Sequence, residues 1–65
     1  MKADKEKIFI LMANKCMEVK DLEVQSHMPR STLNKVLAGK RVRPVTLGKV
    51  AKALNVDVEN IIERR

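Results

Sequence analysis

One short segment gathers the side chains best suited to contacting nucleic acid. It contains Arg30, Ser31, Asn34 and Lys35. On a helix, residues at these spacings share one face. Arginine and asparagine side chains can each make two hydrogen bonds to a base edge. Lysine can contact a guanine or a phosphate, and serine can contact a base or a phosphate. The pattern therefore indicates a helical surface that binds bases and phosphates.

The charge of the chain is concentrated around the same segment. Residues 24–56 contain no Asp or Glu but seven basic residues, whereas the rest of the chain holds seven basic and eight acidic residues. The seven are Arg30, Lys35, Lys40, Arg41, Arg43, Lys49 and Lys52. A surface that is merely solvated mixes both signs. The net charge of +6 therefore favours a polyanionic partner for this block.

Short helices must position these side chains. Apolar residues recur at helical spacing in groups within residues 8–16, 19–26, 33–37, 47–54 and 58–62. Asp4 and Asp57 suit helix N-caps, Pro29 and Pro44 suit helix starts, and Gly39 suits a helix end that needs a positive φ. No stretch alternates as a strand does. We expect one compact all-α domain of four or five helices over residues 1–65, with a largely aliphatic core.

Other classes of function find little support in the sequence. Cys16 and His27 are the single residues of their types, so we expect no metal, no cofactor and no enzymatic site. Cys16 continues the first apolar stripe, which predicts a packed thiol. No apolar run has the length of a membrane span and the charged start does not match a signal peptide, so we expect a cytoplasmic protein. The near absence of aromatic residues disfavours single-stranded ligands.

The motifs together resemble the phage repressor and Cro family, also called the xenobiotic-response-element family of bacterial regulators. The resemblance covers roughly residues 8–62 and includes a helix-turn-helix at about residues 19–38. It is carried by Leu22, Met28–Leu33, Gly39–Arg41 and Thr46–Val56. This resemblance implies a lambda-repressor-like fold and sequence-specific binding of double-stranded DNA by a small transcriptional regulator, most simply a repressor.

Two residues depart from the family pattern. Glu23 stands where the two helices cross and where the family usually has a small residue. His27 stands at the turn, where the family usually has Gly. Glu23 must either face water or pair with a basic residue such as Arg30. His27 tolerates a positive φ better than most residues do, so the turn can still form.

The resemblance also implies roles for individual residues. The third helix would enter the major groove while the second lies across the backbone. Base contacts are then expected from Arg30, Ser31, Asn34 and Lys35. Phosphate contacts are expected from Lys20, Thr32, Lys40, Arg41 and Arg43.

The partners follow from the small size of the domain. A single reading helix contacts few base pairs, so we expect a homodimer, at least on DNA, with half-sites about 34 Å apart. Val56, Val58 and Ile62 are the apolar residues expected to remain exposed for self-association. We expect no small-molecule ligand and no membrane. The alternative is an antitoxin-like protein-interaction module with the same fold, which would need further exposed apolar surface.

Overall fold

The computed structural model describes residues 1–63 and contains four α-helices followed by a single 3-10 turn. The helices are α1 (Lys5–Asn14), α2 (Val19–Ser26), α3 (Arg30–Leu37) and α4 (Pro44–Ala53), and the 3-10 turn is η1 (Val58–Asn60). The expected all-α fold is confirmed. Of the predicted fifth helix, only the 3-10 turn forms. Arg64 and Arg65, the end of the expected domain, lie outside the described residues.

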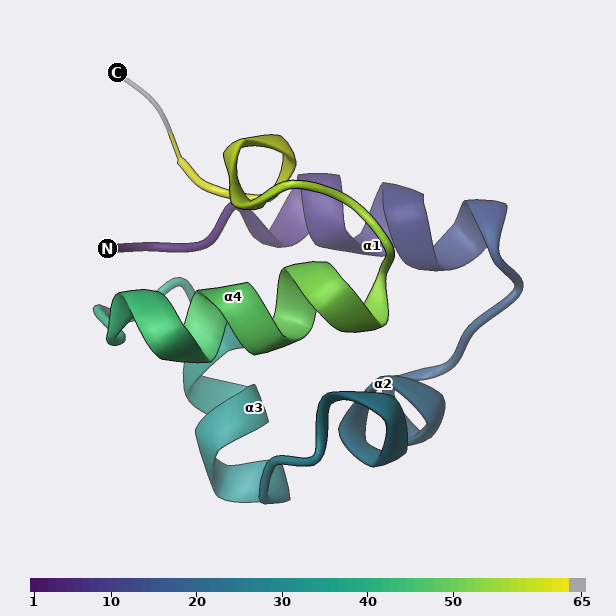
Figure 1. Ribbon diagram of the computed structural model, residues 1–65, viewed down its shortest axis with the longest axis horizontal. Coiled ribbons are helices and arrows are strands. Elements are labelled where there is room, and N and C mark those ends of the chain that lie inside the picture. The colour runs from purple at the N-terminus through teal and green to yellow at the C-terminus, as the bar shows by residue number, and fades with distance from the viewer. Residues whose placement is uncertain (64–65) are drawn as a thin grey trace.

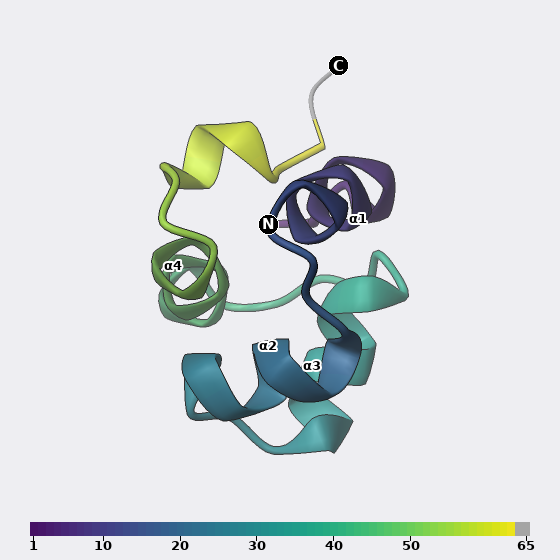
Figure 2. The same cartoon turned by 90° about the vertical axis from the view of Figure 1, so that its right-hand side faces the viewer.

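The helices pack around one core. α1 and α4 run along the long axis of the molecule, and α2 and α3 lie on the other side of α4 from the C-terminal turn (Figure 1). Seen end-on, the C-terminal turn spans from α4 to α1 (Figure 2). The predicted aliphatic core is present: its fully buried large side chains are Ile8, Leu22, Leu33, Val36, Leu47, Val50, Leu54 and Ile61.

The helices α1, α3 and α4 begin where the sequence predicts. The carboxylate of Asp4 accepts hydrogen bonds from the amides of Glu6 and Lys7 at 3.0 and 3.3 Å, so Asp4 is the N-cap of α1. Pro29 is the N-cap residue of α3, and Pro44 is the first residue of α4. Proline suits these positions because its φ is already helical and the first amides of a helix have no intrahelical partner.

Each helix is followed by a residue in the left-handed conformation. These residues are Cys16, His27, Gly39 and Asn55, with φ between 55° and 74°. After α1, α3 and α4, the next amide reaches back five residues to a carbonyl in the last turn, as in Met17 to Met12. This arrangement satisfies carbonyls that a helix end leaves without partners. It also turns the chain sharply, which allows four helices to pack within a short sequence.

The prediction that Cys16 packs in the core is wrong. α1 ends at Asn14 with Lys15 as its C-cap, so Cys16 lies beyond the helix and its side chain is exposed. The left-handed residue reverses the chain, and Met17, rather than Cys16, packs against the core. The helical spacing of apolar residues predicted one buried position beyond the end of α1.

The C-terminal turn belongs to the core. Ile61 is completely buried, and Val56, Val58 and Ile62 are half-buried against the core cluster. These three side chains, expected to remain exposed for self-association, therefore keep only part of their surface accessible. The side chain of Asp57, expected to cap a helix here, makes no capping hydrogen bond to the one-turn η1.

The N-terminal segment joins two distant parts of the chain. Ala3 forms an isolated antiparallel bridge with Ile62, and Lys2 forms one with Arg41. The amide of Asp4 donates to the carbonyl of Ile61 at 2.7 Å. The N-terminal segment is therefore bonded both to the loop between α3 and α4 and to the C-terminal segment. None of the helices within residues 1–63 is both long and apolar enough to span a bilayer.

Candidate nucleic-acid interface

The predicted helix-turn-helix is formed by α2 and α3. The second helix has the predicted span, Val19–Ser26, and the turn after it contains His27 with φ 55°. Leu22, Leu33 and Val36 are completely buried, which fixes the inner faces of the two helices against the core. Leu37, also expected to face the core, is half-buried and packs against it. The opposite face of α3 is therefore left to solvent.

All four predicted base-contacting residues lie on the exposed side of α3. They are Arg30, Ser31, Asn34 and Lys35. The helix begins at Arg30, so the arginine and the serine occupy its first turn while Asn34 and Lys35 lie one turn further along. The structure thus brings hydrogen-bond donors and acceptors together on one exposed helix face. Thr32, predicted to contact phosphate, is half-buried on the side of this face.

An ion pair connects the two helices at this surface. The Nε of Arg30 donates a hydrogen bond to Oε1 of Glu23 at 3.0 Å. Of the two possibilities that the sequence left open for Glu23, the structure has the pairing with Arg30. The side chain of Glu23 keeps 33% of its surface accessible and bonds to the first residue of α3, so its carboxylate is not buried between the helices. The crossing can therefore accommodate a residue larger than the one expected there.

The start of α2 also presents a basic side chain. Lys20 is exposed in the first turn of α2. The carboxylate of Asp21 accepts a hydrogen bond from the amide of Glu18 at 2.9 Å, and this bond stabilises the beginning of the helix. Negative charge near a helix start is favourable for the helix itself. The first turn of α2 therefore carries both positively and negatively charged side chains, unlike α3.

The loop from α3 to α4 carries the other predicted phosphate-contacting residues. Lys40, Arg41 and Arg43 are all exposed. The left-handed Gly39 begins the loop and Pro44 ends it at the first turn of α4. Pro44 restricts the second end, and the main chain of Val42 is hydrogen-bonded to Met1. Three cations on so short a segment are suited to contacting consecutive phosphates.

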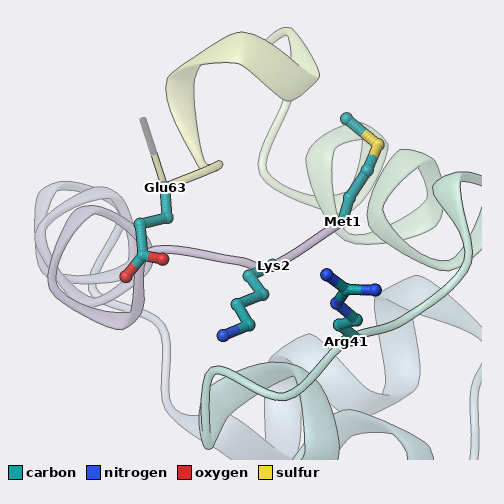
Figure 3. A pocket seen from close by; sticks show the side chains of 4 residues that line it. All are labelled: Met1, Lys2, Arg41 and Glu63. Carbon is teal, nitrogen blue, oxygen red and sulfur yellow. The ribbon is translucent and has the colours of Figure 1, made fainter. Parts of the chain in front are cut away.

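Sequence reasoning missed Lys2. The antiparallel bridge places Lys2 opposite Arg41, and both residues line an open hollow together with Met1 and Glu63 (Figure 3). The two cations are far apart in the sequence, and no local pattern links them. The N-terminal segment shows no strand alternation, so only the tertiary structure identifies Lys2 as part of the basic surface.

The residues considered for other chemistry lie apart. Cys16 is exposed after α1, and His27 is exposed at the turn between α2 and α3. Within residues 1–63, no group of three or more His, Cys, Asp or Glu side chains is arranged to hold a metal ion.

Comparison with known proteins identifies a family. The family model of the Cro/C1-type helix-turn-helix DNA-binding domain matches residues 7–65. Comparison with curated proteins and with solved structures gave no significant match. The matched region includes all four α-helices apart from the first two residues of α1.

Proposed function

The chain belongs to the family of Cro/C1-type helix-turn-helix DNA-binding domains, and from this premise we propose that it is a sequence-specific transcriptional repressor. Its ligand is double-stranded DNA. We assign it no catalytic role. The observation that carries the proposal is the face of α3, where Arg30, Ser31, Asn34 and Lys35 are exposed together while Leu33 and Val36 anchor the helix in the core.

In the proposed complex, α3 enters the major groove. Arg30 donates two hydrogen bonds to a guanine, and Asn34 exchanges two with an adenine. Ser31 and Lys35 contact neighbouring bases. The support for this assignment is the order of residues on α3, because the N-terminal part of a reading helix is the part that meets base edges.

Phosphates on either side fix the position of the protein. Lys20 and Thr32 contact the backbone near the helix-turn-helix, while Lys40, Arg41 and Arg43 contact it from the loop after α3. These contacts add affinity for any sequence and make binding strongly dependent on salt. The main-chain hydrogen bonds between Val42 and Met1 support this role, since an ordered cation loses less entropy on binding.

Two copies bind together in this proposal. One α3 covers too few base pairs for tight specific binding, so a homodimer occupies two half-sites about 34 Å apart. Repression follows from occupancy of the operator and depends on protein concentration.

The test is a selection of binding sites from random duplex DNA, followed by affinity measurements against salt concentration. We expect an enriched and roughly palindromic motif, with two protein chains bound per site in analytical ultracentrifugation. Binding of similar strength to every sequence would contradict the proposal of a sequence reader. Two protein chains on a non-palindromic site would contradict the symmetric dimer alone.

The antitoxin-like alternative requires an apolar surface for a second protein. The described residues expose Phe9 and Ile10 next to each other on α1, with 42% and 57% of their surface accessible. This small patch is the specific observation in its favour. Replacing both residues with Gln leaves both DNA selection and repression in cells unchanged if the chain functions through DNA alone. Loss of repression in cells with unchanged DNA binding would support a protein partner.

A further inference from the structure

The contact between Glu23 and Arg30 crosses the helix-turn-helix. Glu23 belongs to α2 and Arg30 is the first residue of α3. The 3.0 Å hydrogen bond uses Nε of the guanidinium, and the two side chains retain 33% and 49% of their accessible surface. The pair therefore lies on the surface that α3 presents to solvent, and not within the core.

The atom that Glu23 engages leaves the rest of the guanidinium available. An arginine side chain has five N–H groups in a fixed plane, and Nε carries one of them. The four N–H groups on the two terminal nitrogens remain for other acceptors. These are enough for two parallel hydrogen bonds to O6 and N7 of a guanine. A carboxylate on Nε restricts the orientation of the plane and does not occupy the donors that would read a base.

The contribution of the pair to folding is small. Ion pairs exposed to this extent contribute little to stability, because water screens them and both side chains lose freedom. Near DNA, the charge of Glu23 has a further effect, since a carboxylate repels phosphates. Stability and general affinity therefore give no reason for a carboxylate here, whereas orientation of Arg30 does.

We propose that Glu23 is a positioning residue that holds Arg30 in the orientation needed to read one guanine. Its charge lowers the affinity for all DNA sequences. Its contact with Arg30 orders that side chain before binding and so raises discrimination at one base position. This inference rests on the proposed function, because it needs α3 to read bases. It adds a residue of α2 to those that determine specificity.

The experiment compares wild-type protein with Glu23→Gln and Arg30→Ala variants and with the double variant. Glutamine has nearly the same shape as glutamate but lacks the charge, so its amide oxygen accepts only a weaker hydrogen bond from Nε of Arg30. Glu6→Gln is the matched control, because it removes one exposed carboxylate from α1, outside the helix-turn-helix. Each variant is measured on the selected site, on that site with each single base pair replaced, and on unrelated duplex DNA. Thermal unfolding of each variant is recorded in parallel.

We expect Glu23→Gln to bind unrelated DNA a few-fold more tightly while discrimination at one guanine falls about tenfold, equivalent to about 1.4 kcal/mol. Arg30→Ala should lose discrimination at the same position. The double variant should be no less selective there than Arg30→Ala alone, because the two residues act as a unit. Glu6→Gln should leave base preference unchanged.

The outcomes separate the inference from the function on which it rests. If wild-type protein enriches no site, the proposed function fails and the inference fails with it. If Arg30→Ala relaxes one position but Glu23→Gln shifts binding to all sequences equally, Glu23 is only a surface charge. In that case the inference is overturned and the proposed function stands. Loss of selectivity accompanied by an equal loss of thermal stability in Glu23→Gln would also overturn it, since that would indicate a structural role.

Discussion

The main chains of Met1 and Val42 are joined by two reciprocal hydrogen bonds. The amide of Val42 donates to the carbonyl of Met1 at 2.9 Å, and the amino group of Met1 donates to the carbonyl of Val42 at 3.1 Å. The N-terminal segment therefore lies alongside the loop that follows α3, and it places Lys2 opposite Arg41. The basic loop is therefore paired with a segment that carries a further cation, Lys2.

This pairing leads to a prediction for Arg41 and Lys2. We expect Arg41→Ala to weaken binding to all DNA sequences similarly and to lower the slope of log K against log salt by about one unit. Lys2→Ala should have the same kind of effect, because Lys2 is bridged to Arg41 and lines the same hollow. Fluorescence anisotropy titrations at several salt concentrations measure both quantities.

Lys5→Ala is the matched control for this pair, because it removes an exposed lysine from the first turn of α1. Its salt slope should remain close to that of the wild type. A loss confined to one DNA sequence in Arg41→Ala would show that this residue reads a base. An unchanged slope in Lys2→Ala would remove Lys2 from the interface.

Asn34 is predicted to read one base. It is exposed in the second turn of α3, on the same side as Arg30. A bidentate contact between asparagine and adenine contributes about 1–3 kcal/mol of discrimination. We therefore expect Asn34→Ala to relax the preference at a single position of the selected site. The measurement is a second selection from random duplex DNA with this variant, and an unchanged motif would exclude the role.

Much of the fold follows from local signals in the sequence. Asp4 caps α1, Gly39 takes a positive φ after α3, and Pro44 begins α4, all as predicted. These features depend on a few neighbouring residues, so the sequence is sufficient to find them. The exposed face of α3 was predictable for the same reason. Once Leu33 and Val36 are assigned to the core, helical geometry determines which residues face away.

The errors and omissions concern features that local pattern cannot determine. The exposure of Cys16 depends on where α1 ends, and this end is decided by the chain reversal that brings Met17 to the core. Val56, Val58 and Ile62 are half-buried because they pack against the core cluster, and Ile62 is also bridged to Ala3. The proximity of Lys2 and Arg41 depends on tertiary structure. The pairing of Glu23 with a residue of α3 does so as well. A residue's helical face is local information, but its partner on another element is not.

The left-handed turn residues lead to a prediction about stability. His27 has φ 55°, a conformation that costs residues with a Cβ atom about 1–2 kcal/mol, whereas glycine adopts it readily. We expect His27→Gly to raise the free energy of unfolding by up to about 1 kcal/mol, part of the gain being offset by the greater freedom of glycine in the unfolded chain. Urea denaturation followed by circular dichroism measures this difference.

Gln25 offers a matched control for the same substitution. It is exposed within α2, so Gln25→Gly should lower the free energy of unfolding by about 0.5–1 kcal/mol. Opposite signs at residues 25 and 27 would establish that the effect at His27 comes from its backbone conformation. A loss of stability in both variants would mean that the imidazole side chain stabilises the turn.

Ile61 tests whether the C-terminal turn is part of the folding unit. Its side chain is completely buried although it follows a one-turn 3-10 helix. Its carbonyl accepts a hydrogen bond from the amide of Asp4. If the turn folds with the core, Ile61→Val should cost about 0.5–1.5 kcal/mol and Ile61→Ala about 2–5 kcal/mol. For a domain of this size, each 1 kcal/mol lowers the midpoint of thermal unfolding by about 4–8 °C.

Val45→Ala is the control for loss of apolar volume, since Val45 lies on α4 with 68% of its surface exposed. This change should alter the free energy of unfolding by less than about 0.5 kcal/mol. Scanning calorimetry of the three variants decides between two cases. A graded loss from Ile61→Val to Ile61→Ala, in a single transition, means that the N-terminal segment, the C-terminal turn and the helix-turn-helix unfold together. An Ile61→Ala variant as stable as Val45→Ala would mean that the turn can detach while the DNA-binding helices remain folded.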